Sequence, residues 1–370
     1  MNLSYWELQT WLRNVDFTIV GSGIVGLSTA LQLQQKLPKA KIVILEKGLF
    51  PQGASTKNAG FACFGSLSEI LQDLQSHTPD EVVALVKQRH DGLQLLRATL
   101  GDDNLSYKQL GGYELFLEKD RHLYETCLQQ IKNINTLLKP IFKAEVFSNV
   151  TNSFGFTKVQ DNYIRNQFEG QIDTGKMMQA LIRKAQKQGI IILNNTTVES
   201  YIEDVNTVAI KTNHFDFSST KLIITTNGFA QQLVNEDIQP ARAQVLITKP
   251  IQDLHIKGTF HLDCGYYYFR NIDNRILLGG GRNLDFATET TTKFSQTERI
   301  QTALEALLAT TILPSTPFEI EHRWSGIMGV GAQKTPIVKQ LSNHTYCGVR
   351  MGGMGVAIGS IIGKEVSALI

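Results

Sequence analysis

The sequence predicts an α/β protein in which a parallel sheet flanked by helices is joined to a second, antiparallel sheet. Three observations support this fold class. Residues 16–47 run from an apolar strand through a glycine turn and a helix into another apolar strand, which is how a βαβ unit begins. Residues 171–225 return to such a sheet through a helix and further apolar strands. From residue 241 onward short alternating segments take over, and alternation is typical of antiparallel strands.

The first of these stretches carries a dinucleotide-binding pattern. Residues 21–26 read G-S-G-I-V-G and follow directly on the strand 17–20. The next strand, 42–45, ends on Glu46, about twenty residues beyond the last glycine. A lone G-x-G-x-x-G is a weak signal, but strand, glycine turn, helix and acid all occur here at the expected spacing. We therefore expect a dinucleotide site, although the motif alone does not separate FAD from NAD.

Each residue of the pattern has a physical role. Gly21 permits the tight turn, and Gly23 lets the backbone approach a pyrophosphate because it has no side chain. Gly26 allows the helix to lie close to the sheet. The helix N-terminus points N–H groups at the phosphates, and the Glu46 carboxylate can accept hydrogen bonds from a ribose hydroxyl.

Periodicity and turn residues predict the other elements in order. The expected helices cover residues 79–100, 120–138, 175–188, 295–309 and 356–369. The expected strands cover residues 111–117, 155–156, 163–166, 190–193, 196–201, 208–212, 215–218, 221–225, 244–248, 266–270, 276–280, 318–325 and 345–348. Residues 326–331 are glycine-rich and follow a strand. The segments between residues 79 and 166 indicate a lobe inserted after the nucleotide-binding start.

The N-terminal segment, residues 1–14, is amphipathic and predicts a helix that lies on the domain surface. Trp6 and Trp11 leave a membrane-surface contact open as the alternative. The segment lacks the basic start and long apolar core of a secretion signal. No stretch is apolar enough to span a bilayer, and we expect a cytoplasmic protein.

Charge and cysteine usage argue against several classes of function. The formal net charge is +2, which makes no electrostatic case for nucleic acid. Hydrophobic residues are 42% and charged residues 19% of the chain, as in globular proteins that bury a substantial core. The four cysteines are far apart and form no C-x-x-C pair. We therefore expect neither a metal site nor a disulfide framework, and a reducing compartment fits.

Two further segments indicate a large cofactor. Residues 48–70 are rich in small residues and poor in charge, so they predict a loop that cradles a ligand rather than a plain surface loop. Gly352, Gly353 and Gly355 form a second strand-to-helix junction, and a helix N-terminus there offers partial positive charge and free N–H donors. Such a junction suits the flavin end of FAD, whereas an NAD-only dehydrogenase would not need it. The alternative is a glycine-lined helix packed tightly on the sheet.

Taken together, the sequence resembles the D-amino acid oxidase family of FAD-dependent oxidoreductases, which includes glycine oxidase, sarcosine oxidase and the γ-glutamylputrescine oxidases. The resemblance covers nearly the whole chain, in the family's order and spacing. The segments that carry it read IVGSGIVGLSTA with ILEK, GASTKNAGF, QIDTGKMMQALIRKAQKQGI, LIITTNGFA, PARAQVLITKP, YYYFRNIDNRILLGGGRN, HRWSGIMGVGAQKTPIV and GVRMGGMGVAIGSIIGKEVSALI.

What the resemblance implies for the fold is a GR2-type, Rossmann-like FAD-binding domain interleaved with an antiparallel-sheet substrate domain. The FAD-binding domain would comprise residues 1–78, 151–230 and 326–370. The substrate domain would comprise residues 79–150 and 231–325. FAD would be non-covalent, since the cysteine positions that the family uses for attachment are not found here.

The resemblance also implies which residues hold FAD. The glycine turn would bind the pyrophosphate and Glu46 the adenosine ribose, while Val198 would contact adenine. The loop after Glu46 would follow the ribityl chain and the isoalloxazine ring, and the second glycine junction would lie against the pyrimidine side of the flavin. The expected set is Gly21, Ser22, Gly23, Gly26, Glu46, Lys47, Ser55, Thr56, Asn58, Ala59, Gly60, Val198, Asn227, Gly228, Gly353, Met354, Gly355 and Val356.

The main departure from the family concerns the substrate. Amino-acid-oxidising members read roughly W-x-G-[LF]-R, and that arginine grips the substrate carboxylate. This sequence has Met328 there, and a thioether cannot form a bidentate pair with a carboxylate. Arg270 is the first candidate to replace the arginine, because Tyr266, Tyr268 and Arg270 would share the strand face toward the flavin. Arg323 and Arg350 come next, and the alternative is an amine substrate without a nearby carboxylate.

Two other kinds of side chain are ambiguous in the sequence. Lys334 stands where many family members have an acidic residue before the proline. It is either a basic group near the flavin that promotes O₂ reduction or a surface lysine on a loop. His261, His322 and His344 are isolated in the sequence, and we expect structural rather than catalytic roles for them.

The reaction that the resemblance implies is oxidation of a C–N bond in an amine or amino-acid-like small molecule. Hydride would pass to flavin N5, the imine would hydrolyse, and O₂ or an electron acceptor would reoxidise the flavin. Two alternatives stay open: a 2-hydroxy-acid dehydrogenase on the same fold, and a flavin-binding subunit or sensor without turnover of its own. An NAD(P)-linked reductase is disfavoured because the sequence holds one nucleotide fingerprint. The sequence leaves the oligomeric state open.

Overall fold

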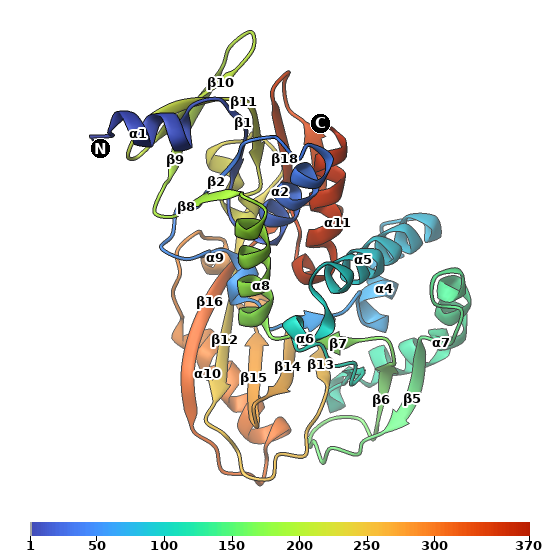
Figure 1. Cartoon of the computed structure of the whole chain (residues 1–370). Coiled ribbons are helices and arrows are strands. Elements are labelled where there is room, and N and C mark those ends of the chain that lie inside the picture. The colour runs from blue at the N-terminus through green and yellow to red at the C-terminus, as the bar shows by residue number, and fades with distance from the viewer. Residues whose placement is uncertain (1) are drawn as a thin grey trace.

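A computed structural model describes residues 2–370 and contains two eight-stranded sheets (Figure 1). The first sheet is mostly parallel, in the order β17-β18-β11-β1-β2-β8, and β10 and β9 extend it from β11. Its strands are β1 (Val15–Val20), β2 (Ile42–Leu45), β8 (Ile191–Leu193), β9 (Val198–Glu203), β10 (Val208–Thr212), β11 (Asp216–Ile224), β17 (Ile337–Gln340) and β18 (Thr345–Val349). Because β1 lies between β2 and β11, the glycine turn that follows it is at the centre of the sheet's carboxyl edge, where ligands of open α/β sheets bind.

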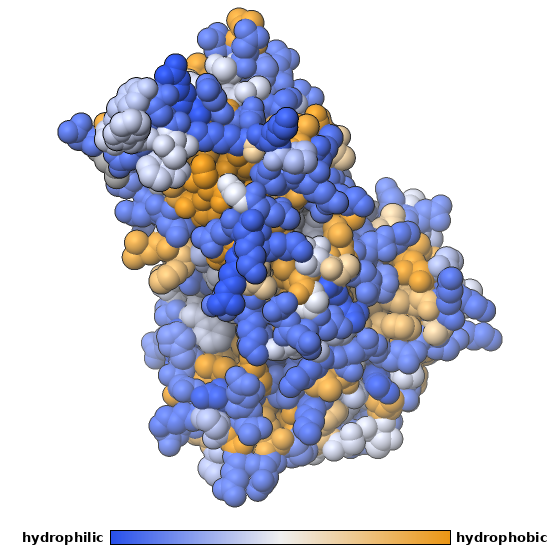
Figure 2. All heavy atoms as spheres, viewed as in Figure 1, coloured by the Kyte–Doolittle hydropathy of each residue, from blue (hydrophilic) through white to orange (hydrophobic). Residues whose placement is uncertain are grey.

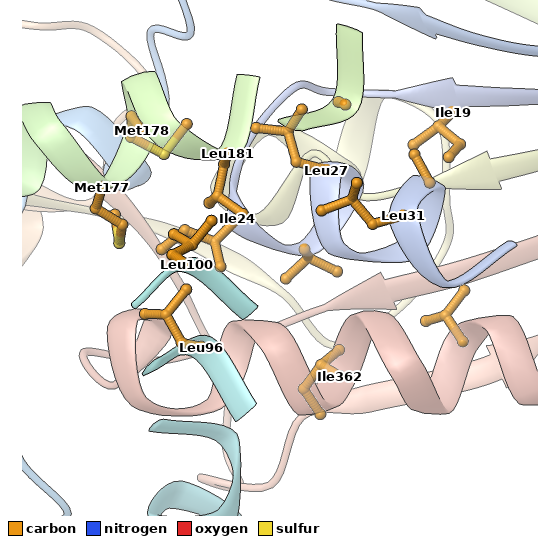
Figure 3. Packing of buried hydrophobic residues seen from close by; sticks show 14 of the residues in the cluster. Ile19, Ile24, Leu27, Leu31, Leu96, Leu100, Met177, Met178, Leu181 and Ile362 are labelled. Atoms are coloured by element: carbon orange, nitrogen blue, oxygen red, sulfur yellow. The ribbon is translucent and has the colours of Figure 1, made fainter. Parts of the chain in front are cut away.

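Four helices cover one face of the first sheet, and Figure 3 shows their packed side chains. They are α2 (Ile24–Lys36), α5 (Pro79–Leu100), α8 (Thr174–Lys187) and α11 (Gly355–Ala368). Glycines let α11 approach its neighbours closely. A Cβ on Gly363 would lie 2.5 Å from the Ser28 Cβ of α2, and one on Gly92 of α5 would lie 2.3 Å from the Ala357 carbonyl oxygen of α11. The last helix is therefore held between α2 and α5.

The boundaries of α5 follow from its end residues. The Thr78 side chain accepts a hydrogen bond from the Glu81 N–H, and the Glu81 carboxylate accepts one from the Thr78 N–H, which is a capping box. Pro79 occupies the first helical turn, where its missing N–H costs nothing. Gly101 ends the helix with a φ of 82°, a conformation that favours glycine. The predicted helix 79–100 is confirmed.

The second sheet has the order β16-β12-β15-β14-β13-β4-β6-β5 and is antiparallel except where β13 pairs with β4. Its strands are β4 (Gly112–Glu114), β5 (Phe147–Thr151), β6 (Asn162–Asn166), β12 (Gln239–Thr248), β13 (Thr259–Leu262), β14 (Tyr267–Ile272), β15 (Arg275–Gly280) and β16 (Ile320–Val330). Helix α10 (Glu298–Leu307) packs on one face, around the stacked rings of Phe260 and Phe269. The alternate residues of β13 and β14 point to the opposite face.

The remaining elements connect these layers. Helices α4 (Leu67–Asp73) and α7 (Arg121–Phe142) build a small core with α5 and β5. Strands β3 (Phe61–Ala62) and β7 (Gly170–Gln171) form a two-stranded sheet. The short helices are α1 (Tyr5–Glu7), α3 (Ala54–Lys57), α6 (Asp102–Leu105) and α9 (Phe286–Glu289).

Four predicted elements differ in the structure. Residues 155–156 form no strand, and the predicted strands 215–218 and 221–225 are one continuous strand, β11. The strand predicted over 318–325 continues through the glycine-rich residues as far as Val330 in β16, because β12 supplies an antiparallel partner along this length. Tyr266 lies in the turn before β14 rather than on the strand. The longer strands β11 and β16 reflect tertiary pairing that outweighs local residue preference.

The N-terminal segment is a short helix, α1, followed by a π-helical turn over Leu8–Leu12. Met1, the first residue of the predicted helix, lies outside the described residues. Trp6 is 73% exposed and Trp11 is 44% exposed, so the aromatic side of this segment is not covered by the rest of the chain. Within the part of the chain that the structure describes, no helix is long and apolar enough to cross a membrane. The face seen in Figure 2 is mostly hydrophilic, with separate apolar patches.

The domain boundaries stay a prediction, and the strands near them lie as follows. β6 falls within the segment 151–230 but pairs in the second sheet. β16 runs across the expected boundary between residues 325 and 326 and lies in the second sheet along its whole length. Helix α5, expected in the substrate domain, contributes Leu93, Leu96 and Leu100 to the core of the first sheet.

Candidate active site

A cavity of about 430 Å³ lies between the two sheets. One part of its wall comes from the β1–α2 turn, the end of β2 and residues 196–198. The other part comes from residues 261–268, from β16 and from the start of α11. The cavity therefore joins the carboxyl edge of the parallel sheet to one face of the antiparallel sheet. A single elongated ligand can contact both.

Most of the predicted site residues line this cavity. The lining residues among them are Gly21, Gly23, Glu46, Lys47, Ser55, Asn58, Ala59, Val198, Asn227, Gly353, Met354, Gly355 and Val356, together with Tyr266, Tyr268 and Met328. The predicted residues outside the lining are Ser22, Gly26, Thr56, Gly60, Gly228 and Arg270. Ser22 and Gly26 belong to the glycine turn itself but do not face the cavity.

The glycine turn has the close contacts that its pattern predicts. Gly21 has a φ of 101°, and a Cβ on Gly26 would lie 2.0 Å from the Gly21 carbonyl oxygen. A Cβ on Gly23 would lie 2.8 Å from the Ser55 Oγ, and this hydroxyl accepts a hydrogen bond from the Ile24 N–H at the start of α2. Helix α3, which contains Ser55, is thereby tied to the N-terminus of α2, on which a pyrophosphate is expected.

Glu46 is buried and holds the turn together. Its Oε2 accepts hydrogen bonds from the Ser22 N–H (3.1 Å) and hydroxyl (2.8 Å), and its Oε1 accepts one from the Gly48 N–H. A carboxylate oxygen can accept more than one bond, and Glu46 also lines the cavity. Its expected contact with a ribose hydroxyl thus remains sterically open, in addition to a structural role that the sequence pattern did not indicate.

The second glycine junction is anchored to both sheets. The Asn227 Oδ1 at the end of β11 accepts a hydrogen bond from the Met351 N–H. The Gly352 N–H donates to the Gly329 carbonyl of β16. Gly352 has a φ of 57°, and α11 begins at Gly355 beside the cavity. The start of α11 is therefore positioned where its free N–H groups can meet a ligand.

The Tyr268 side chain is closely packed in the cavity wall. It pairs with Gly279 across β14 and β15, and a Cβ on that glycine would lie 2.7 Å from the Tyr268 hydroxyl. Phe61 packs edge-on against the ring at 5.6 Å. Burial raises the pKa of Tyr268 to about 12, so the hydroxyl stays protonated and can donate a hydrogen bond.

Arg270 occupies a different place from the one expected. It is only 2% exposed, and its guanidinium lies about 3 Å from where a Cβ on Gly60 would be. Burial lowers its pKa to about 10, and its Nε has no hydrogen-bond partner. Arg270 is therefore packed against Gly60 and does not line the cavity. The two other predicted arginines are engaged, Arg323 with Gln301 and Glu305, and Arg350 with Asp237 and Thr335.

Several cavity residues were missed or underrated in the sequence. Glu69, Cys63 and Arg282 line the cavity, as do His261 and Lys334. Lys334 forms an ion pair with the buried Asp73. The spacing of His261 opposite Tyr268 on neighbouring strands is the signal that could have placed it on the same sheet face. Nothing in the sequence pairs it with its acidic partner.

His261 is bonded to a buried acid, so it is not isolated. Its Nε2 lies 2.6 Å from the Glu169 Oε1, which also accepts a hydrogen bond from the Thr259 hydroxyl at 2.8 Å. Burial lowers the pKa of His261, but the Glu169 carboxylate more than offsets this and raises it to about 9. Cys63 brings a third potential metal-ligating atom within 4.8 Å. Because His261 and Glu169 neutralise each other, we describe them as an ion pair rather than as ligands of a metal ion.

The His261–Glu169 pair makes stability depend on pH. A histidine whose pKa rises from about 6.5 to about 9 on folding stabilises fully below pH 6.5 and loses this contribution as the pH rises through 9. We expect the difference in unfolding free energy between wild type and His261→Gln to shrink by on the order of 3 kcal/mol across that window. Urea unfolding from pH 6 to 9.5 measures it.

The matched control is His255→Gln, which removes an exposed histidine bonded to the Phe154 carbonyl. Its difference from wild type should stay within about 0.5 kcal/mol across the same pH range. A His261→Gln difference that does not change with pH would contradict the assigned ion pair.

Comparison with known proteins identifies the family of this chain. The DAO family, described as FAD dependent oxidoreductase, matches residues 16–369. The chain belongs to this family. It is therefore an FAD-dependent oxidoreductase, and the expected resemblance is confirmed. Probable oxidoreductase OrdL of Haemophilus influenzae is 21% identical in an alignment of 383 positions that covers 98% of this chain and 84% of that protein.

Solved structures of the family have the same fold. Glycine oxidase from Geobacillus kaustophilus has a TM-score of 0.78 at 17% identity, over 96% of this chain and 94% of that one. L-proline dehydrogenase from P. horikoshii has a TM-score of 0.76 at 19% identity, over 96% and 93%. Iminodiacetate oxidase from Chelativorans sp. BNC1 has a TM-score of 0.74 at 18% identity, over 95% and 94%. The predicted mixed fold is confirmed.

The residues of this cavity fit FAD. Two lysines of the wall have no acidic partner within hydrogen-bonding distance among residues 2–370. The Lys47 Nζ lies 3.4 Å from the centroid of the Phe229 ring, and the Lys57 Nζ lies 5.0 Å from that of Phe294. Two cations beside the glycine turn suit the charge of a pyrophosphate. The start of α11 faces the other part of the same cavity, where a flavin ring would be accommodated.

Proposed function

We propose that this enzyme oxidises a C–N bond of an amine or amino-acid-like small molecule and that its electrons leave to O₂ or another acceptor. The observation that carries the proposal is the single cavity that runs from the glycine turn to the tyrosines of the second sheet. Relatives with this fold include an oxidase of glycine and a dehydrogenase of L-proline. The same chemistry on a small substrate is the simplest use of this cavity.

FAD, when bound, supplies the two-electron acceptor for the reaction. The chain's residues would bind and orient the reactants. The glycine turn, Lys47 and the start of α11 would hold the cofactor. Tyr268 would donate a hydrogen bond to the substrate, and Phe61 beside it would keep water from the reacting carbon.

The cavity has no free histidine to take a proton from the substrate amine, as far as residues 2–370 are concerned. His261 is bonded to Glu169, and its raised pKa keeps the ring protonated. The proposal therefore requires an amine that arrives uncharged or loses its proton to water, for which no strong side-chain base is needed. Activity should accordingly rise with pH toward the pKa of the substrate amine.

The test is reduction of the purified flavoprotein in the absence of oxygen. A panel of amines, amino acids and N-alkylated amino acids is mixed with the enzyme, and loss of the oxidised-flavin absorbance is followed. We expect at least one C–N compound to bleach the flavin, and readmitted O₂ or a dye to restore it. Bleaching by 2-hydroxy acids alone would establish a hydroxy-acid dehydrogenase instead. Tight FAD that no compound reduces would support a flavin-binding subunit or sensor.

A further inference from the structure

Among the lysines and arginines that line the cavity, Lys334 is paired with Asp73, whereas Lys47, Lys57 and Arg282 have no ion pair with any of residues 2–370. These three fall into two groups. Lys47 and Lys57 lie beside the aromatic rings of Phe229 and Phe294, in the part of the wall where FAD phosphates are expected. Arg282 lies in the other part, with the tyrosines of the second sheet. A pyrophosphate would be neutralised by the first group, which leaves the Arg282 charge without a counterion from the cofactor.

The backbone presents Arg282 to the cavity through an unusual turn at the end of β15. Gly280 and Gly281 have φ values of 126° and 77°, and the Gly281 N–H donates to the Tyr266 carbonyl at 2.9 Å. A Cβ on Gly280 would lie 2.1 Å from that carbonyl oxygen. Only glycine fits there, so the turn holds Tyr266 and Arg282 next to each other.

The guanidinium of Arg282 has no hydrogen bond and no ion pair with any residue from 2 to 370. The Phe286 ring packs against it, with the ring centroid 4.8 Å from Cζ. The guanidinium is half-buried, and burial lowers its pKa, which means that its charged form is poorly solvated. The nearby acid, Glu289, already holds Arg242 with both oxygens, at 2.7 and 2.6 Å.

Two other arginines of the second sheet are neutralised by acids. Arg275, on the same hairpin, pairs with Glu321, and Arg323 pairs with Glu305. Arg282 differs from these in being directed at the cavity with all five of its N–H donors unused. A planar cation with free donors in such a place matches a carboxylate, which it can bind through two parallel hydrogen bonds.

We propose that Arg282 binds the substrate carboxylate, in place of the arginine that Met328 replaces. This inference rests on the proposed function and specifies its substrate class as amino acids or N-substituted amino acids rather than simple amines. The carboxylate-binding arginine would then lie in the turn after β15 instead of in β16. The Met328 sulfur lies instead about 4 Å from where a Cβ on Gly353 would be, and it contributes apolar wall. Tyr266 and Tyr268 line the same cavity as Arg282, and their hydroxyls would assist in binding.

The test uses benzoate, a carboxylate that cannot be oxidised at a C–N bond. Benzoate is titrated into the FAD-loaded enzyme, and binding is followed by the flavin difference spectrum and by calorimetry. We expect Arg282→Gln to raise the dissociation constant for benzoate about 10- to 100-fold, the loss of a charge-assisted bidentate pair. The dissociation constant of Arg282→Lys should lie between those of wild type and Arg282→Gln, because lysine keeps the charge but cannot form two parallel hydrogen bonds.

Two controls make the outcome specific. Arg275→Gln removes a paired arginine from the same hairpin and should leave benzoate binding unchanged. Benzamide, which has no charge, should bind wild type and Arg282→Gln equally. FAD content and circular dichroism verify that the variants are folded. Wild-type enzyme that binds no benzoate, or Arg282→Gln that binds it as tightly as wild type, would overturn the inference.

Failure here is distinguishable from failure of the proposed function. If C–N compounds bleach the flavin but carboxylates bind independently of Arg282, the function stands and the anchor is wrong. If benzoate binding depends on Arg282 and no C–N compound bleaches the flavin, the anchor stands and the proposed reaction is wrong. The matched substrate pairs are an amino acid and the amine that remains after its carboxylate is removed, and wild type should prefer the acid.

Discussion

Replacing Gly26 with alanine should yield a folded but colourless protein that no longer retains FAD. The added Cβ would lie 2.0 Å from the Gly21 carbonyl oxygen and 2.8 Å from the Thr225 Oγ1. Neither atom is the free end of a flexible side chain. The turn must open to relieve the contact, and its N–H groups then no longer converge on the pyrophosphate. Overpacking of this kind costs about 3 kcal/mol, which corresponds to a loss of roughly 100-fold in FAD affinity.

The measurement is the ratio of flavin to protein absorbance after purification, followed by titration of the apoprotein with FAD. Gly175→Ala is the matched control, because its Cβ, at the start of α8, would meet only the Asp173 side chain, at 3.3 Å. That variant should be as yellow as wild type. Far-UV circular dichroism separates lost binding from lost folding. Stoichiometric FAD in Gly26→Ala would contradict the assigned turn.

Replacing Glu289 with glutamine should lower the free energy of unfolding by about 3–5 kcal/mol, because it leaves the Arg242 charge buried and unpaired. The two side chains are 4% and 0% exposed. The guanidinium donates to both carboxylate oxygens, and the Gln244 side chain donates a further hydrogen bond at 2.9 Å. The pair attaches α9 to β12, the strand next to the edge strand β16, so its loss should also loosen the wall that carries Arg282.

Urea unfolding of the apoprotein measures this change, and Glu319→Gln provides the comparison. Lys249 and Glu319 form an ion pair of similar length whose side chains are 56% and 72% exposed. Exposed pairs contribute little, so Glu319→Gln should change the unfolding free energy by less than about 1 kcal/mol. The double variant Arg242→Met/Glu289→Leu should recover much of the stability lost in Glu289→Gln. Equal effects of Glu289→Gln and Glu319→Gln would refute a buried pair.

What could be predicted from the sequence was local. The glycine turn, its flanking strands and Glu46 are adjacent along the chain, and each requires a particular residue type. Helix α5 carries its own start and stop signals at Thr78 and Gly101. The second glycine junction was recognisable for the same reason. Local chemistry of this kind determines the cofactor part of the cavity and most of the first sheet.

What could not be predicted depended on pairing between distant segments. The bond between His261 and Glu169 joins residues 92 positions apart, and no periodicity marks it. Arg270 shares a strand face with Tyr268, but it is buried against Gly60 and does not line the cavity. Arg282 follows a glycine run that reads as a strand end, and only the turn at Gly280 and Gly281 reveals its direction. The substrate part of the cavity is therefore a product of tertiary structure.

The position of β18 and α11 determines the order of events during synthesis. Strand β18 pairs with β11, and α11 lies between α2 and α5, yet both are translated after every other element of this sheet. A growing chain on the ribosome exposes Leu27 and Leu31 of α2 long before Ile362 can cover them (Figure 3). The fingerprint turn emerges first but lacks the opposite wall of its cavity. The wall opposite the fingerprint turn is therefore completed only when α11 docks, and until then the apolar face of α2 is open to aggregation.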